Sequence, residues 1–586
     1  MAAHFVDLPN VEVFLTLRRS LTPFENRLSV FVFLLLCYFI FFYDLGGPAL
    51  FEPDEGRNAE VAREILLIND WATPYYNFLP RLDKPVFFYW PAALSFKIFG
   101  VSEWSARLPS ALGGLGCGLL IYLIARTLLG PWGALWSSLI LVTSTEYFVL
   151  SRIVIAEMVL VFFITLSLCS FYWGSHTERT TYGRLFYGLM WGATGIAFLA
   201  KGPVGLLLPG AVICIYLFLS RRWFLIRDWE FFLGLPVFLI LVLAGYAWSE
   251  IKNPGYLSYF LFEENFLRFF TSHFERGAPW YFFLGVLAVG FLPWTFLIPI
   301  IVKETWNKLS DDKILFLIVW TLVPLLFFSL SNSKAPHYIL VIYPPLSILA
   351  GRSLTRVFED SLRRKNWVFS LPWLTLSTLF TFTVLSFYLA DLLPQELRIP
   401  PRGLQILQGN ITLILLLGLI FLCLAIGMRF SANLDGPYCF SCLGFCVLFL
   451  FLSAITGSIS SIRSSKELAE KSARVIGPKD QIVIYDAYLS SLPFYLSIDR
   501  PIWVVWSGQK SRLMGSSYIA KKRPQPAPGY GRVLYTFEEF SELWKPFGEK
   551  LLVFIEEKNL PRLAEQVATV PKVLVKVDDI VLVTNR

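Results

Sequence analysis

The sequence predicts a polytopic α-helical membrane protein with about thirteen transmembrane helices, outer-face amphipathic helices and a small C-terminal soluble α/β domain. Only 16% of the 586 residues are charged and 55% are hydrophobic, whereas soluble proteins contain about 25% charged residues. The hydrophobic residues form runs of about 20, the length that a helix needs to cross a bilayer. From residue 461 onward such runs are absent. A soluble multidomain enzyme and a disordered chain are therefore both excluded.

Thirteen apolar runs are candidate membrane spans. They cover residues 28–45, 106–129, 132–150, 153–174, 185–200, 203–220, 231–249, 280–302, 314–330, 338–355, 367–390, 411–428 and 438–458. The breaks at Gly130-Pro131 and Lys201-Gly202-Pro203 separate short neighbouring runs, because glycine and proline interrupt helices. An odd number of spans places the two ends of the chain on opposite sides of the membrane.

The basic residues of the short loops indicate the orientation. If the N-terminus is cytoplasmic, loops on that side carry most of them, as the positive-inside rule requires. These residues are Arg18, Arg19, Arg27, Arg126, Arg179, Arg184, Arg221, Arg222, Arg227, Lys303, Lys308, Lys313, Arg352, Arg356, Arg363, Arg364, Lys365 and Arg429. We therefore expect a cytoplasmic N-terminus and an outer C-terminal domain. The net charge of +8 is explained by this bias, so nucleic acid is not an expected partner.

In this orientation three segments lie on the outer side of the membrane: residues 46–105, 250–280 and 461–586. The first two are long loops of the membrane domain, residues 1–460, and the third is the outer soluble domain. In the first loop, residues 55–69 combine good helix formers with Val61, Ile65 and Ile68 at helical spacing. This pattern predicts an amphipathic helix that lies on the membrane surface.

The C-terminal segment alternates strand-like and helix-like stretches. Short β-branched runs predict strands at Gln481–Tyr485, Pro501–Val505, Leu551–Ile555 and Ile580–Val583. Helices are expected at Phe537–Trp544 and Leu560–Val567, and a surface loop at the proline-rich Arg523–Pro528. No motif in this domain indicates its function. It could cover an acceptor groove, bind a partner or stabilise the outer loops.

The densest polar cluster lies in the first outer loop. Glu52, Asp54, Glu55 and Arg57 are close in sequence, and Asp83 with Lys84 follows in RLDKP. Charged groups beside hydrocarbon are costly unless they are paired or hydrated, so such a cluster indicates a functional site. The alternative is a solvated loop whose charges pair with each other.

This cluster contains what transfer of a group from a phosphate to an alcohol requires. Asp54 could accept the proton of an attacking hydroxyl, and Lys84 with Arg57 could hold an anionic leaving group. Glu55 belongs to the same catalytic cluster. Cations at this depth suit the phosphate of a membrane lipid, whose head group lies at the boundary.

Other residues on the outer side could join the site. They are Glu157, Lys201, His273, Arg276, Lys334, His337 and Tyr343. Each has a structural alternative: Glu157 could pair with Arg152, and Lys201 could extend toward the interface. Asp83 with His273 could ligate a divalent metal, although two ligands far apart in sequence are a weak pattern.

Several motifs, in one order, resemble the GT-C glycosyltransferases related to the bacterial aminoarabinose transferase that modifies lipid A, which are themselves similar to protein O-mannosyltransferases. The resemblance extends from about residue 25 to 355. The motifs are FEPDEGRNAEVARE, RLDKPVFFYWP, SRIVIAEMVLVFF, FLAKGPVG, EENFLRFF, SHFERGAPWYFF and SNSKAPHYILVIYPPL.

This resemblance implies a multi-pass glycosyltransferase of the bacterial inner membrane. It implies transfer of a pentose or hexose, with 4-amino-4-deoxy-L-arabinose as one candidate, from undecaprenyl phosphate to a lipid A-like or other envelope acceptor, with inversion. Asp54 and Glu157 resemble catalytic carboxylates. At the position of Glu157, relatives often carry Asp. The donor-phosphate contacts it implies are Arg57, Lys84 and Tyr343, and Lys201 and Arg276 are further candidates for this role from their place on the outer side. Asp83 and His273 resemble a metal-capable pair.

Two alternatives stay open. A protein O-mannosyltransferase acting on Ser or Thr would have the same donor site and a different acceptor. A lipid or sugar transporter belongs to another class, but transporters place ionisable residues near the membrane midplane. In this sequence the ionisable residues gather in the outer loops and at the outer span ends.

Overall fold

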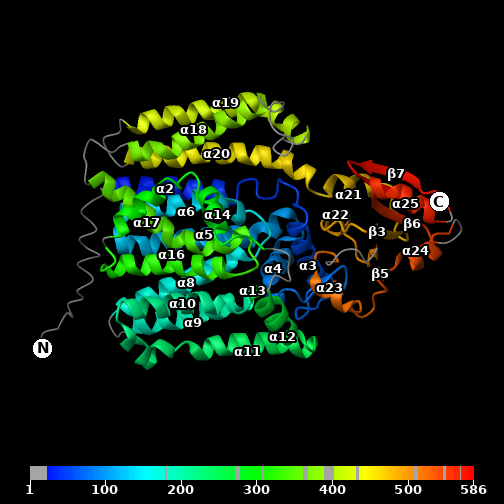
Figure 1. The fold of residues 1–586 in the computed structure, drawn as a ribbon, viewed down its shortest axis with the longest axis horizontal. Coiled ribbons are helices and arrows are strands. Elements are labelled where there is room, and N and C mark those ends of the chain that lie inside the picture. Colours follow the sequence, from blue (N-terminus) through cyan, green and yellow to red (C-terminus); the bar gives the residue numbers. More distant parts are fainter. Residues whose placement is uncertain are drawn as a thin grey trace.

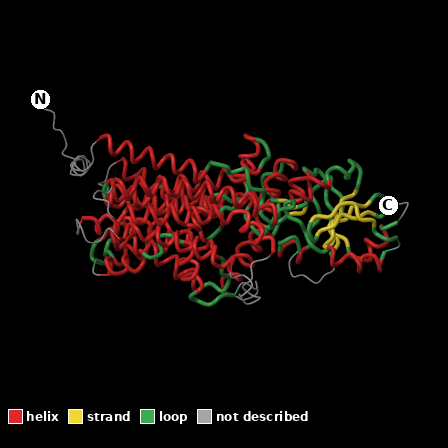
Figure 2. The backbone as a smooth tube through the Cα atoms, turned by 90° about the horizontal axis from the view of Figure 1, so that it is seen from above, coloured by secondary structure: helices red, strands yellow, loops and turns green. Residues whose placement is uncertain are grey.

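Long apolar helices lie side by side through most of the chain, and a small sheet lies beyond one end of them (Figure 1). At right angles to this view the strands are again confined to that end (Figure 2). The computed structural model describes residues 23–177, 181–270, 277–306, 308–359, 367–388, 401–429, 435–506, 513–545, 549–567 and 569–586. The arrangement agrees with the predicted helical membrane protein that carries a C-terminal α/β domain.

Helices occupy the predicted spans. They are α2 (Pro23–Phe41), α5 (Glu103–Leu129), α6 (Pro131–Thr143), α7 (Thr145–Ser151), α8 (Glu157–His176), α9 (Thr181–Lys201), α10 (Val204–Leu219), α11 (Leu235–Lys252), α14 (Phe282–Gly290), α15 (Leu297–Trp306), α16 (Asp312–Leu330), α17 (Tyr343–Glu359) preceded by η6 (Pro336–Ile342), α18 (Trp367–Tyr388), α19 (Pro401–Arg429) and α20 (Asp435–Ile462). Within the described ranges, eight helices are long and apolar enough to cross a membrane. The pair α6 and α7, bent by 66°, would make a ninth.

Two predicted spans are divided, and the run at 132–150 forms the bent pair α6 and α7. The run at 280–302 forms two short helices, α14 and α15, because the backbone turns between Phe291 and Phe296. Elsewhere local chemistry sets the helix ends as expected. Ser102 caps α5 by accepting from the Ser105 amide, and α5 ends at Gly130, whose φ of 85° suits glycine.

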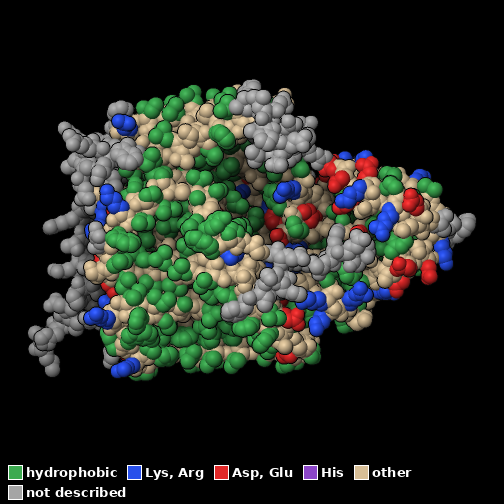
Figure 3. Space-filling view, viewed as in Figure 1, with side chains coloured by type: hydrophobic (Ala, Val, Ile, Leu, Met, Phe, Trp, Pro, Cys, Tyr) green, Lys and Arg blue, Asp and Glu red, His purple; other side chains and the backbone are tan. Residues whose placement is uncertain are grey.

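The surface of the helical part is mostly apolar. In Figure 3 hydrophobic side chains cover its sides, while charged side chains gather at its two ends and over the C-terminal domain. Inside, large side chains such as Trp136, Trp294, Trp320 and Trp373 are almost completely buried. An apolar belt between charged ends is the surface that a bilayer-spanning protein requires.

The first outer loop folds into α3 (Asp54–Ile68), β1 (Tyr75–Tyr76), β2 (Leu79–Pro80), η2 (Val86–Phe88) and α4 (Trp90–Phe99). The helix at α3 lies where the sequence predicts it, but the prediction that it lies on the membrane surface is wrong. Every residue from Glu55 to Ile65 is buried. The C-terminal domain covers this helix, since a Cβ on Gly56 would lie 2.6 Å from the Ser491 amide nitrogen.

The C-terminal domain is built on a six-stranded mixed sheet in the order β5-β4-β3-β6-β8-β7. Neighbours from β5 to β6 are parallel, and β8 pairs antiparallel with both β6 and β7. The strands are β3 (Gln481–Tyr485), β4 (Trp503–Val505), β5 (Leu534–Tyr535), β6 (Leu551–Glu556), β7 (Lys572–Val577) and β8 (Ile580–Thr584), and the helices are α21 (Lys466–Ser472), α22 (Leu492–Leu496), α23 (Ser517–Lys522), α24 (Phe537–Leu543) and α25 (Leu560–Gln566).

All four predicted strands and both predicted helices of this domain are confirmed. The missed strands are the two edges of the sheet: β5 has two residues, and β7 is largely exposed. The proline-rich segment is a loop as predicted, yet it is not only a surface loop. Ala527 is buried, and its amide donates to the carbonyl of Phe78 at 2.8 Å.

Polar contacts attach the domain to the first outer loop. The carboxylate of Glu52 accepts from the Ser490 amide at 2.8 Å and from the Ser491 amide at 2.6 Å. The side chain of Asn77 donates to the Ile502 carbonyl at 2.8 Å and accepts from the Ile502 amide at 2.9 Å. Because these bonds replace water on buried groups, they fix where the domain lies over the helices.

Candidate active site

A cavity of about 310 Å³ opens where the helices meet the first outer loop and the C-terminal domain. It is polar on the side of the loop and apolar between the helices. Its ionisable and polar lining includes Asp54, Glu55, Arg57, Arg81, Asp83, Lys84, Glu157, Lys201, Glu264, Arg268, His337 and Ser517. The structure therefore brings together seven of the ten predicted site residues, from segments far apart in sequence.

Asp54 and Arg57 form an ion pair at the start of α3. The two residues are three apart in a helix, so their side chains lie on one face. The Asp54 side chain is 75% exposed and that of Arg57 is 10% exposed. Nε of Arg57 is buried and has no hydrogen-bond partner among the described residues. The pair thus presents an accessible carboxylate beside a guanidinium with a free donor.

Lys84 is the cation without a carboxylate partner on the described walls of the cavity. Its Nζ lies 4.2 Å from the centroid of the Phe88 ring and makes no ion pair with any residue that the structure describes. Burial lowers the pKa of Lys84 to about 7; the charge of Glu157 raises this pKa, and the charges of Arg81 and Arg57 lower it. An anion bound in the cavity would favour the charged form of this side chain.

Glu157 and Lys201 join α8 to α9 at the cavity wall. Nζ of Lys201 lies 2.6 Å from Oε1 of Glu157, and Nε2 of His337 lies 3.4 Å from the same oxygen. The alternative that Glu157 pairs with Arg152 is wrong. Arg152 instead donates to the carbonyl of Ile40, in the last turn of α2, and to that of Tyr43, just beyond the helix, where backbone carbonyls lack helical partners.

Glu55 has a structural set of contacts. Its carboxylate accepts from Nε and Nη2 of Arg107 at 2.9 and 2.8 Å. It also accepts from the amides of Phe51 and Val154 at 3.0 and 2.8 Å. With both oxygens engaged and the side chain buried, Glu55 holds the first outer loop against α5 and the loop before α8.

Asp83 binds the C-terminal domain. Its carboxylate accepts from the Ser516 hydroxyl and from the amides of Ser517 and Tyr518, both at 3.1 Å. These donors stand at the start of α23, where helix amides lack internal partners. A metal ion at Asp83 would have to displace them, so these contacts do not fit a metal ligand. Among the described residues no three His, Cys, Asp or Glu side chains form a metal-binding group.

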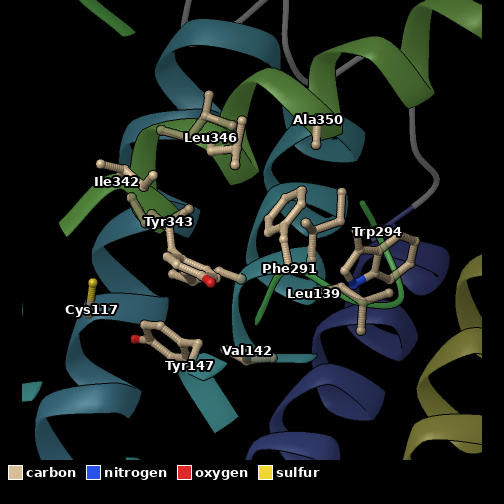
Figure 4. Packing of buried hydrophobic residues seen from close by; sticks show 14 of the residues in the cluster. Cys117, Leu139, Val142, Tyr147, Phe291, Trp294, Ile342, Tyr343, Leu346 and Ala350 are labelled. Atoms are coloured by element: carbon tan, nitrogen blue, oxygen red, sulfur yellow. The ribbon is translucent and has the colours of Figure 1, made fainter. Parts of the chain in front are cut away.

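Tyr343 lies away from the cavity. Its hydroxyl donates to Oε2 of Glu146 at 2.6 Å, and its ring lies 5.8 Å from that of Phe291. Figure 4 shows the side chain among Tyr147, Phe291 and Trp294 in the packed interior. The structure does not bring Tyr343 together with the other predicted donor contacts. His273 and Arg276 lie outside the described residues.

Three further residues of the cavity were not predicted from the sequence. Arg81 is buried, lies 3.6 Å from Asp83 and has an Nε without a hydrogen-bond partner among the described residues. Three charges within four residues of RLDKP, in an otherwise apolar stretch, could have identified it. Glu264 and Arg268 pair at 3.0 Å. Burial and nearby Asp83 raise the pKa of Glu264, and both residues of this pair lie in the motif EENFLRFF.

Comparisons with known proteins agree with this fold. The family model of dolichyl-phosphate-mannose-protein mannosyltransferases matches residues 83–248. The chain is 30% identical over 336 residues to an undecaprenyl phosphate-α-4-amino-4-deoxy-L-arabinose arabinosyl transferase of Edwardsiella ictaluri, covering 56% of this chain and 60% of that protein. It is 36% identical over 332 residues to an uncharacterized protein of Aquifex aeolicus, covering 56% and 74% respectively.

The fold matches a solved structure over nearly its whole length. ArnT from Cupriavidus metallidurans bound to undecaprenyl phosphate superposes with a TM-score of 0.80, at 24% identity, over 95% of this chain and 98% of that one. The apo form of the same protein gives a TM-score of 0.79.

Together, the helical bundle, the outer cavity and the C-terminal sheet define a multi-pass membrane protein with the GT-C fold. The chain spans about three fifths of the length of the first arabinosyl transferases that it matches. It belongs to the GT-C superfamily that contains the bacterial aminoarabinose transferases and the protein O-mannosyltransferases. The predicted family and the predicted helical membrane fold with a small C-terminal α/β domain are thereby confirmed; the expected number of about thirteen spans is not, since eight or nine of the described helices are long and apolar enough to span a membrane.

Proposed function

We propose that the protein transfers a sugar from a polyprenyl phosphate, such as undecaprenyl phosphate, to a hydroxyl group of a lipid A-like or other envelope acceptor. The observation that carries this proposal is that one cavity is lined by both Lys84, which makes no ion pair with a described residue, and the exposed carboxylate of Asp54. The cation suits a lipid phosphate, and the accessible carboxylate suits a hydroxyl proton. The sugar is a pentose or hexose, and the names of the relatives favour 4-amino-4-deoxy-L-arabinose.

The reaction is a single displacement. The acceptor oxygen attacks the anomeric carbon and forms the new glycosidic bond while the bond from that carbon to the phosphate oxygen breaks. Asp54 accepts the hydroxyl proton, and the bonding electrons leave with the polyprenyl phosphate. Lys84 and Arg57 stabilise the charge that develops on this leaving group. The configuration at the anomeric carbon inverts.

The membrane placement follows from the loop charges. Arg221, Arg222 and Arg227 lie in a loop on the proposed cytoplasmic side, and the cavity lies at the opposite side with the C-terminal domain. The positive-inside rule supports a cytoplasmic N-terminus and a C-terminal domain in the periplasm, at a bacterial inner membrane. Membrane lipids surround the apolar belt, and the donor tail extends between the helices.

The test is reconstitution of the full chain with a radiolabelled undecaprenyl-phosphate sugar and lipid A. We expect labelled lipid A with wild-type protein and a loss of at least a hundredfold in rate with Asp54→Asn or Lys84→Ala. Glu538→Gln and Lys479→Ala, at exposed positions of the C-terminal domain, serve as matched controls. If folded Asp54→Asn and Lys84→Ala proteins transfer sugar at the wild-type rate, the assigned roles are wrong.

A second candidate is a protein O-mannosyltransferase, favoured by the family model that matches residues 83–248. The donor half of the cavity would serve both reactions. The same preparation, given mannosyl polyprenyl phosphate and a Ser/Thr-rich peptide, distinguishes them by the labelled product. Movement of donor lipid across the vesicle membrane without any covalent product would instead indicate a transporter.

A further inference from the structure

A tight turn of the C-terminal domain reaches the cavity. The Ser516 amide donates to the Leu513 carbonyl at 2.9 Å, which closes a four-residue turn. The two central residues, Met514 and Gly515, have φ angles of 53° and 70°. Positive φ at both central positions is typical of a type I′ turn, in which glycine is favoured because it has no Cβ.

Gly515 lies directly against the guanidinium of Arg57. A Cβ built on Gly515 would overlap Nη1 of Arg57, and it would lie 3.4 Å from Cζ. On its other side the same guanidinium pairs with Asp54 through Nη2. Arg57 is therefore held between a glycine of the C-terminal domain and the exposed carboxylate of α3.

Asp83 fixes the position of this turn. It accepts from the Ser516 hydroxyl, which belongs to the turn, and from the next two amides at 3.1 Å each. Asp83 precedes Lys84 in the first outer loop, so the turn is attached beside the unpaired cation of the cavity. The C-terminal domain thus contacts Arg57 directly and binds Asp83, the residue that precedes Lys84.

We infer that the turn Leu513–Ser516 is a wall of the donor site and that Gly515 is a positioning residue, which sets the guanidinium of Arg57 against Asp54. This inference rests on the proposed function, because it assigns Arg57 to the donor phosphate. Because Gly515 has no side chain, the guanidinium of Arg57 can occupy the space beside it. Any larger residue displaces a flexible arginine end, which the fold tolerates, and moves the group that binds the phosphate.

The test compares Gly515→Ala with Gly529→Ala in the full chain. Gly529 also has a positive φ, 88°, and a Cβ there would meet nothing within 4 Å. Both variants therefore carry a similar backbone penalty, and only Gly515→Ala touches Arg57. We expect similar thermal unfolding temperatures for the two variants. Binding of undecaprenyl phosphate in nanodiscs should weaken at least fivefold in Gly515→Ala and stay within twofold of wild type in Gly529→Ala.

A double-mutant cycle shows whether the effect acts through Arg57. In an Arg57→Ala background, adding Gly515→Ala should weaken binding by no more than twofold further. A Gly515→Ala protein that binds as tightly as Gly529→Ala overturns the inference, and so does a full additional loss in the Arg57→Ala background. Wild-type protein that fails to bind undecaprenyl phosphate instead overturns the proposed function, and with it the donor-site role of the turn.

Discussion

Glu55 and Arg107 form a buried ion pair with two hydrogen bonds, which joins α3 to α5. The side chains are 3% and 2% exposed. Arg107 also donates to the carbonyls of Leu45, Pro48 and Ala49. The guanidinium of Arg107 therefore donates hydrogen bonds both to the backbone that enters the first outer loop and to the carboxylate of Glu55. Since Glu55 directly follows Asp54, these bonds hold the proposed catalytic carboxylate in place.

Glu55→Gln should destabilise the protein. The neutral amide leaves Arg107 buried without a counter-charge, and breaking a buried pair in this way costs about 3–5 kcal/mol. Thermal unfolding in detergent should show a marked decrease in the unfolding temperature. Glu467→Gln, which removes an exposed pair with Lys471, is the control and should change little. Equal stability of the two variants would show that the buried pair is not a major contact.

Donor binding should weaken as the pH rises above about 7. Burial lowers the pKa of Lys84 to about 7, so above this pH the empty cavity holds an increasingly neutral amine. Binding a phosphate then requires protonation, and the affinity should fall by up to about tenfold per pH unit. Titrations with undecaprenyl phosphate between pH 7 and 9 measure this slope.

Lys84→Arg provides the control for that pH dependence, because arginine stays charged throughout the range. Its affinity should be nearly constant between pH 7 and 9. The same lowered pKa predicts that Lys84 makes the wild-type fold more stable as the pH rises from about 7 to 10.5, since the unfolded chain binds the proton and the folded chain does not. A wild-type binding curve as flat as that of Lys84→Arg would contradict the assignment.

Glu52→Ala should loosen the C-terminal domain. The variant removes the acceptor of the Ser490 and Ser491 amides and of the Ser465 hydroxyl, and leaving such buried donors unsatisfied costs about 1–3 kcal/mol each. Limited proteolysis should cut between residues 461 and 465 faster than in wild type. Glu538→Ala, at an exposed position of α24, should leave the cleavage rate unchanged. A wild-type rate in Glu52→Ala would mean that apolar packing alone holds the domain.

Tyr343→Phe should affect stability more than donor affinity. The variant removes the hydroxyl that donates to Glu146 at 2.6 Å, and a hydrogen bond to a buried carboxyl contributes about 1–3 kcal/mol. Because Tyr343 does not line the cavity, binding of undecaprenyl phosphate should stay within twofold of wild type. A tenfold loss of affinity with unchanged thermal unfolding would instead support the contact that the family resemblance implies.

Much of the fold was predictable because its signals are local. Apolar runs gave the helix positions, and β-branched runs gave the four central strands of the C-terminal sheet. The charge cluster around Asp54 and Lys84 was also visible, because charges are rare in such an apolar chain. The break between α14 and α15 could not be predicted, since hydrophobicity alone does not distinguish a straight helix from two short ones.

The partners of the charged residues were not predictable. Asp83 has the residue type of a metal ligand, yet it binds amides 434 and 435 positions away. Glu157 has Arg152 nearby in sequence, yet it pairs with Lys201, 44 positions away. Such pairings depend on which elements meet in space. A helix predicted to lie on the membrane became a buried helix for the same reason, since the covering domain is encoded at the other end of the chain.

The bond between Asp83 and Ser516 spans 433 positions, which has a consequence for biosynthesis. A ribosome that adds about 5–20 residues per second needs on the order of 20–90 s to make the chain between them. During this interval the helices from α5 to α20 are synthesised, while the last wall of the cavity does not yet exist. A nascent or truncated chain therefore has an open site, and the donor meets a complete one only after synthesis has finished.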